Sequence, residues 1–119
     1  MEDTVNQRIR RLRKELKLTQ SAFSSVISIS SGQLACIETE KRAVNNRTIK
    51  LICDTFDVNN EWLRTGKGPV YIDPAGNSHT KLIALYEVLK PKYRNFILNS
   101  IHWFIKTQNE DGDDDFAAN

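Results

Sequence analysis

The chain has 119 residues, a formal net charge of +2 and 39% hydrophobic residues, which favours one small domain with an appendage. The sequence has no run of 18 apolar residues and no N-terminal signal pattern, so we expect no membrane span and a cytoplasmic protein. Residues 1–72 hold 12 Lys and Arg against 8 Asp and Glu, whereas residues 73–119 hold 5 against 7; a basic first half is typical of a nucleic-acid-binding module.

Helical patterns follow one another through residues 1–68. Thr4 and Gln7 fit a capping box, and the helical spacing behind them predicts a first helix at about 5–17, with an apolar face made of Val5, Ile9, Leu12 and Leu16. Four more helices are predicted by hydroxyl or amide N-cap residues that precede apolar faces, namely Thr19, Ser30, Asn45 or Asn46, and Asn59. No alternating strand pattern appears in this range, so the fold class is all-α with a five-helix domain.

A change in composition marks the end of this domain. Gly66, Gly68, Pro69, Pro74 and Gly76 lie close together, so residues 69–78 are interpreted as a linker. The leucine spacing after residue 79 and a proline at position 91 predict two helices, which would form a helical hairpin at 79–108. Residues 109–119 are acidic and are predicted to be a disordered, solubilising tail, with competition against DNA as the alternative.

The last predicted helix carries more apolar surface than one packing contact needs. At 100° per residue, the apolar side chains of residues 93–105 cover an arc of about 220°. We expect two partners for this arc, the preceding helix and the same hairpin of a second chain, which would form a homodimer. The alternative is that the helix folds back onto the N-terminal domain. The expected dimerisation residues are Leu85, Leu89, Phe96, Ile97, Ile101, Trp103 and Phe104.

Residues and short motifs of the N-terminal half occur at spacings that all match the pattern of one known family. They are Arg13, Leu18-Thr19-Gln20, Phe23, Ser24, Ile27, Ile29-Ser30, Leu34, Ile37-Glu38, Lys41-Arg42, Ile52, Phe56, Val58, Trp62-Leu63 and Gly66. With these motifs, residues 5–69 resemble the lambda-repressor-like (Cro/CI, XRE-type) helix-turn-helix DNA-binding family. The resemblance implies double-stranded DNA as the partner and a recognition helix that begins at Ser31 and lies in the major groove. The sequence departs from the family at Ser28, where glycine is usual, so a positive φ there would carry a strain of about 1 kcal/mol.

The resemblance also implies roles for individual side chains. The outward positions of the recognition helix would read base edges, and they are Ser31, Gly32, Gln33 and Cys36. The alternative for Gln33 is that it only closes a capping box with Ser30. Phosphate contacts are expected from Gln20, Lys41, Arg42, Asn45, Asn46 and Arg47. Arg13 and Glu38 are expected to form a largely buried ion pair that supports the fold.

These features predict a transcriptional regulator, a repressor of phage or prokaryotic origin that binds a two-half-site operator as a homodimer. No Gly-rich phosphate loop or nucleophile constellation appears, so we expect no enzyme. No metal or other cofactor is expected, because the cysteines and histidines show no zinc-site spacing. The alternative function is a protein-interaction module, an antirepressor or an antitoxin that uses the same scaffold to hold a protein partner.

Overall fold

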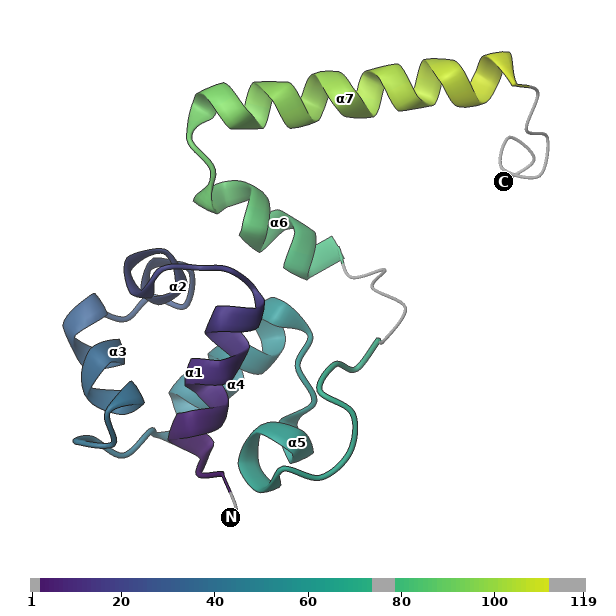
Figure 1. Ribbon diagram of the computed structural model, residues 1–119. Coiled ribbons are helices and arrows are strands. Elements are labelled where there is room, and N and C mark those ends of the chain that lie inside the picture. Colours follow the sequence, from purple (N-terminus) through teal and green to yellow (C-terminus); the bar gives the residue numbers. More distant parts are fainter. Residues whose placement is uncertain (1–2, 74–78, 112–119) are drawn as a thin grey trace. The chain divides into compact units, whose positions relative to one another are not determined.

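The computed structural model describes residues 3–73 and 79–111, which form helices joined by loops (Figure 1). Within these residues the only β-structure is an isolated antiparallel bridge between Val58 and Tyr71, so the predicted all-α fold is confirmed. The chain divides into two compact units between Val88 and Leu89. The first unit contains α1 (Val5–Glu15), α2 (Gln20–Val26), α3 (Ser31–Glu38), α4 (Asn46–Phe56), α5 (Asn60–Thr65) and α6 (His79–Val88), and the second contains α7 (Pro91–Glu110).

Each of the first five helices begins at a residue whose side chain accepts a backbone hydrogen bond. For α1, Thr4 Oγ1 accepts from Gln7 N at 3.1 Å and Thr4 N donates to Gln7 Oε1 at 3.2 Å, which completes the predicted capping box. The other N-caps are Thr19, Ser30, Asn45 and Asn59, so Asn45 rather than Asn46 caps α4. These bonds satisfy backbone donors that a helix leaves unpaired in its first turn.

A residue with a left-handed backbone follows each of these five helices. α1 ends at Glu15, earlier than the predicted end at about residue 17, because Lys17 has a φ of 60°. The same conformation recurs at Ser28, Glu40, Asp57 and Gly66. Ser28, with a φ of 62°, lies in the turn between α2 and α3, where Ile29 N donates to Ser24 O at 2.9 Å. The strained turn that the sequence indicated at Ser28 is therefore present, at a cost of about 1 kcal/mol.

The core of the first unit decides which face of α3 is left outside. Phe23 of α2 and Phe56 of α4 stack with their ring centroids 5.3 Å apart. Leu34 and Ile37 of α3 are buried in the same cluster. Burial of side chains of this size stabilises the fold by about 1.5–3 kcal/mol each. Because Leu34 and Ile37 point inward, the opposite face of α3 is turned to solvent. Figure 1 shows α1 in front of α4, with α3 to its left and α5 to its right.

The sixth helix belongs to the first unit, which differs from the expected boundaries of a 1–68 domain, a 69–78 linker and a 79–108 hairpin. α6 packs against α2 and α4, where Ala84 is buried and Leu85 is half-buried against the core. Lys81 Nζ lies 3.9 Å from the centroid of the Tyr71 ring. The chain before it is also held, because Asn59 N donates to Val70 O at 2.8 Å. Residues 74–78 lie outside the described residues. Leu85, expected at a dimer interface, is thus part of this unit's packing.

The last helix, α7, is described by itself. It is 20 residues long, it begins with Pro91 at its first turn as predicted, and none of its residues is buried. The exposed large apolar side chains on it are Tyr93, Phe96, Leu98, Ile101, Trp103, Phe104 and Ile105. Only Leu89 and Lys90 separate α7 from α6, which is consistent with the expected hairpin. The predicted acidic tail lies mostly at 112–119, outside the described residues. No helix of the described part is long and apolar enough to cross a membrane.

Candidate nucleic-acid interface

The outer face of α3 presents the four residues that the sequence predicted for base readout. Ser31 and Gly32 are exposed, and Gln33 and Cys36 are half-buried. A Cβ atom built on Gly32 would meet no other atom within 4 Å. The packing of this chain therefore does not require glycine at position 32, and the backbone there is open to a close approach from outside.

The Gln33 side chain is not used to cap its own helix. Ser30 Oγ accepts from Gln33 N at 3.0 Å, which is the first half of a capping box. The second half, a bond from the Ser30 backbone to the Gln33 side chain, is absent from α3 although α1 has its equivalent. Within residues 3–73 and 79–111 the Gln33 amide has no hydrogen-bond partner. The Gln33 side chain thus does not close a capping box with Ser30, and its amide is left for another partner.

An ion pair joins α1 to the end of α3. Arg13 Nε lies 2.6 Å from Glu38 Oε2, and Arg13 Nη2 lies 2.9 Å from Glu38 Oε1. The side chains of Arg13 and Glu38 are only 12% and 2% exposed. Burial alone would raise the pKa of Glu38, but hydrogen bonds from Arg13 and Gln20 and the charges of Arg13 and Arg10 outweigh it and lower that pKa. Glu38 therefore stays ionised in the folded protein.

Gln20, at the start of α2, takes part in the same cluster. Its Nε2 atom donates to Glu38 Oε1 at 3.1 Å. The sequence reasoning predicted a phosphate contact for Gln20 and did not predict this bond. A primary amide nitrogen carries two hydrogens, so one remains for a phosphate oxygen. The ion pair thus holds the Gln20 amide in place at a helix N-terminus, where backbone N–H groups favour anions.

The loop between α3 and α4 carries two exposed cations, Lys41 and Arg42. The loop is tied to the end of α3, because Lys41 N donates to Cys36 O at 2.9 Å. It is also tied to the first turn of α1, because Asn6 Nδ2 donates to Arg42 O at 2.9 Å. Sequence reasoning did not identify Asn6. An amide two residues after a capping threonine was its only signal in the sequence, and that signal does not point to a distant loop.

The start of α4 holds the remaining three candidates. Asn45 Oδ1 accepts from Thr48 N at 2.8 Å, and Asn46 Oδ1 accepts from Arg64 Nη1 at 2.9 Å. Both amide oxygens are therefore engaged within the protein, and only the amide nitrogens remain to donate. Arg47 is exposed, and it borders a small pocket of about 150 Å³ that Gln33 and Asn45 also line. Candidates for base and phosphate contacts thus meet at one place on the surface.

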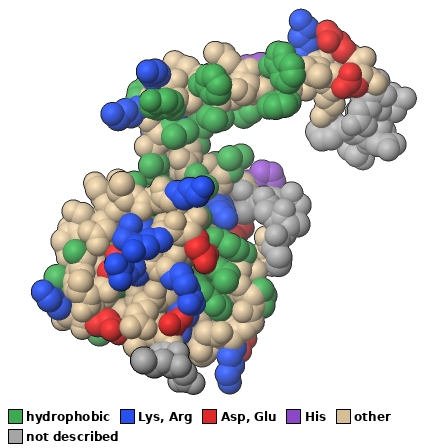
Figure 2. Space-filling view, in the orientation of Figure 1, with side chains coloured by type: hydrophobic (Ala, Val, Ile, Leu, Met, Phe, Trp, Pro, Cys, Tyr) green, Lys and Arg blue, Asp and Glu red, His purple; other side chains and the backbone are tan. Residues whose placement is uncertain are grey.

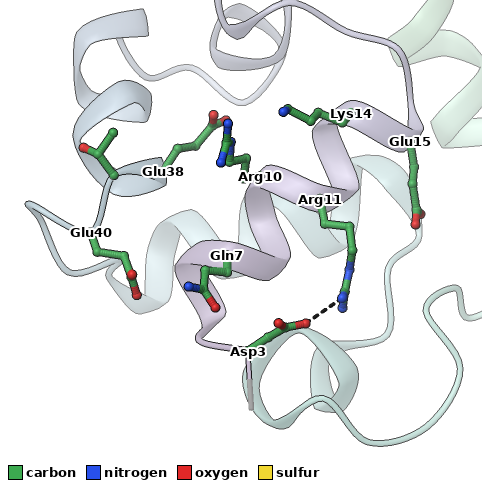
Figure 3. A pocket seen from close by; sticks show the side chains of 9 residues that line it. Asp3, Gln7, Arg10, Arg11, Lys14, Glu15, Glu38 and Glu40 are labelled. Carbon is green, nitrogen blue, oxygen red and sulfur yellow. Dashed lines mark ion pairs between the residues drawn. The ribbon is translucent and has the colours of Figure 1, made fainter. Parts of the chain in front are cut away.

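A larger open groove runs along α1 (Figure 3). Lys and Arg side chains gather over α1 in the space-filling view, with Asp and Glu among them (Figure 2). Arg11 pairs with Asp3 at 2.6 Å, and Glu38 is already held by Arg13. The groove therefore mixes both charges and has no clear preference for one kind of ligand. Among the described residues, no group of three His, Cys, Asp or Glu side chains could hold a metal ion.

A family model described as a helix-turn-helix domain matches residues 6–69, which is more than half of the chain. This range runs from the first turn of α1 to the segment after α5, and it contains α2, α3 and the strained turn between them. No curated protein and no solved structure matches the chain.

Proposed function

Because the chain belongs to the helix-turn-helix domain family, of the XRE/lambda-repressor-like type, we propose that it regulates transcription by binding operator DNA through α3. The proposed role is repression in a phage or prokaryotic genome. The observation that carries the proposal is the Gln33 amide, which has no partner among the described residues and borders the same pocket as the exposed Arg47. A major groove about 12 Å wide admits one helix, and residues near the N-terminus of such a helix reach the base edges.

Base readout in this proposal comes from Ser31, Gly32, Gln33 and Cys36. Gln33 is the only long amide among them, and an amide can pair with the N6 and N7 atoms of adenine. The other three offer a hydroxyl, open backbone and a thiol. Because this set makes few directed hydrogen bonds, part of the specificity would come from the shape and deformability of the DNA.

Phosphate contacts would surround that surface. Lys41, Arg42 and Arg47 supply exposed cations, and Gln20, Asn45 and Asn46 supply amide N–H donors that the fold leaves available. Each neutralised phosphate makes the dependence of log K on log salt steeper by about 0.9. Contacts of this kind position the protein on the duplex and carry no sequence information directly.

The exposed face of α7 supports a homodimer. Phe96, Trp103 and Phe104 are 69%, 59% and 62% exposed, which is unusual for large aromatic side chains that lie together on a protein surface. A second copy offers the same face, so the two helices can cover each other with two-fold symmetry. Two recognition helices about 34 Å apart would then read two half-sites. Ile97, Ile101 and Leu89 complete the proposed interface.

The proposed function is tested by footprinting the purified full-length protein on DNA upstream of its own gene, over a range of about 50 to 200 mM salt. We expect two protected half-sites, about one helical turn apart, that are lost as the salt concentration rises. Gln33→Ala should weaken binding to this operator more than to unrelated DNA, whereas Lys41→Ala should weaken both and reduce the salt slope. A folded protein that protects no DNA at low salt would contradict the proposal.

The dimer is tested separately by sedimentation. The double variant Phe96→Ser, Phe104→Ser should sediment as a monomer while its thermal melting stays close to that of the original protein. His102→Ser, on the polar side of the same helix, is the matched control and should leave the dimer intact. If the original protein sediments as a monomer, the proposed dimer is wrong, and the proposed DNA binding is unaffected.

The exposed aromatic face of α7 also favours a second candidate, a protein-interaction module that acts as an antirepressor or an antitoxin. Such a module would use α7 to hold a protein partner instead of a second copy. Absence of any DNA protection, together with a monomeric original protein, would support it. A toxin gene next to the gene of this protein would point to the antitoxin version.

A further inference from the structure

The first turn of α1 holds the loop that follows α3, through one side-chain amide. Asn6 Nδ2 donates to Ile37 O at 2.9 Å and to Arg42 O at 2.9 Å. The two hydrogens of that nitrogen are thus both used, one at the end of α3 and one within the loop. Thr4 adds a second link nearby, because its Oγ1 donates to Glu40 Oε1 at 2.7 Å.

The loop has little else to fix it beyond its start. Lys41 N and Arg42 N both donate to Cys36 O, which fixes the first part of the loop to α3. Residues 39–43 are all exposed, and only Val44 packs against the core. Between the start of the loop and Val44, the bond from Asn6 to Arg42 O therefore attaches the loop backbone to α1.

We propose that Asn6 is a positioning residue of the DNA-binding surface, which fixes the backbone of Lys41 and Arg42 so that both cations meet phosphates. The inference rests on the proposed function and adds a residue that itself touches no DNA. Long cationic side chains lose rotamer freedom when they bind, and a fixed starting point reduces the freedom that has to be lost. Residues that hold the contacting residues in this way are needed for a precise binding geometry.

The test compares two near-isosteric variants of the full chain. Asn6→Leu removes both hydrogen bonds without changing the charge. Thr65→Val is the matched control, because Thr65 Oγ1 also makes two hydrogen bonds, to Glu61 O at 2.7 Å and from Lys67 N at 3.2 Å, at a site on α5. Both variants should melt at similar, slightly reduced temperatures. If Asn6→Leu does not fold, Asn6→Ala replaces it, since alanine also removes both hydrogen bonds without adding a charge and favours the helix.

The first readout is trypsin cleavage, which requires no DNA. The carbonyl that trypsin attacks after Arg42 is the one that accepts from Asn6. We expect Asn6→Leu to be cut after Arg42 several times faster than the original protein, with cleavage after Lys67 unchanged. Thr65→Val should be cut faster after Lys67, with cleavage after Arg42 unchanged. Equal cleavage after Arg42 in the original protein and in Asn6→Leu would overturn the anchoring itself.

The second readout is the salt dependence of operator binding. Loss of one or two phosphate contacts should make the slope of log K against log salt shallower by about 0.9 for each contact in Asn6→Leu. Thr65→Val should keep the original slope. An unchanged slope in Asn6→Leu overturns the inference while the proposed function stands. If the original protein itself shows no salt-dependent binding, the proposed function fails and the inference fails with it.

Discussion

Arg13 and Glu38 join α1 to α3 through two hydrogen bonds, of 2.6 Å and 2.9 Å, in a position that is almost closed to water. Among the residues that the structure describes, no other cation lies this close to Glu38. Arg13 also donates to Leu18 O at 2.9 Å, which ties the pair to the start of α2. One ion pair therefore connects the three helices that carry the proposed DNA-binding surface.

Removing one partner of the ion pair should take away a large part of the stability of the domain. Glu38→Ala would leave the guanidinium of Arg13 buried without its counter-charge, which typically costs about 3–5 kcal/mol. Because small domains have a total stability of about 5–15 kcal/mol, urea unfolding should show the loss directly. Glu61→Ala, in the exposed first turn of α5, should change the free energy of unfolding by about 1 kcal/mol at most. A Glu38→Ala protein with the original midpoint would show that the pair does not hold the fold.

The same carboxylate should make stability depend on pH. The pKa of Glu38 in the folded protein is lowered from its ordinary value of 4.5, so the unfolded chain takes up a proton first as the pH falls. The contribution of Glu38 is therefore fully present above pH 4.5 and is lost as the pH falls through the lowered pKa. Urea midpoints should fall more steeply below pH 4.5 for the original protein than for Glu38→Gln. If the urea midpoints of the original protein and of Glu38→Gln fall in parallel with pH, Glu38 is not the source of the pH dependence.

Replacing Ser28 should stabilise the turn between α2 and α3. Ser28 has a φ of 62°, and glycine adopts this conformation without the cost that a Cβ atom brings. Ser28→Gly should raise the free energy of unfolding by about 0.5–1 kcal/mol, measured by urea unfolding. Ser25→Gly, in the last turn of α2, should lower it by about 0.5 kcal/mol because glycine is less favourable than serine in a helix. The same sign of change in both variants would refute the explanation by backbone strain.

The sequence predicted what depends on neighbouring residues and missed what depends on tertiary contacts. The N-caps Thr4 and Ser30 could be predicted because a cap and its helix lie within a few residues of each other. The contact of α6 with α2 and α4 could not be predicted, because it depends on how separate helices pack. Asn6 was missed for the same reason, since its bond partners lie more than 30 residues away. Side-chain bonds to distant backbone carbonyls leave no pattern in the sequence.

Arg8 is another such residue, and it should be important for stability. It is buried, although arginine is seldom buried unless it is paired. Its guanidinium donates to Leu63 O at 2.8 Å, Arg64 O at 2.8 Å and Asp3 O at 2.6 Å. It thus caps the C-terminal end of α5, where carbonyl groups favour a cation.

Arg8→Met keeps the apolar stem and removes these bonds. Since a hydrogen bond to a charged group contributes about 1.5–3 kcal/mol, the variant should lose at least about 3 kcal/mol of unfolding free energy. The unfolding free energy of Arg8→Lys should lie between those of Arg8→Met and the original protein, because a single ammonium group cannot reach carbonyls in three directions. Arg10→Met, on the exposed side of the same helix, is the control and should change the midpoint little. Equal midpoints for Arg8→Met and Arg10→Met would contradict this role.

Gly32 offers a way to separate DNA binding from stability. A Cβ atom at this position meets nothing within the protein, so Gly32→Ala should raise the free energy of unfolding by about 0.5 kcal/mol, because alanine favours the helix. Gly68→Ala is the contrasting control, since its φ is 87° and its Cβ would lie 3.0 Å from Asn59 Nδ2, so it should destabilise the fold.

Under the proposed function, the new methyl group of Gly32→Ala would enter the space where α3 approaches the bases. Operator binding, measured by titration with labelled DNA, should then weaken on the order of tenfold in a protein that is more stable than the original. If Gly32→Ala binds the operator as well as the original protein does, the backbone at position 32 does not approach the DNA closely, and Gln33 and its neighbours would have to reach the bases from a greater distance.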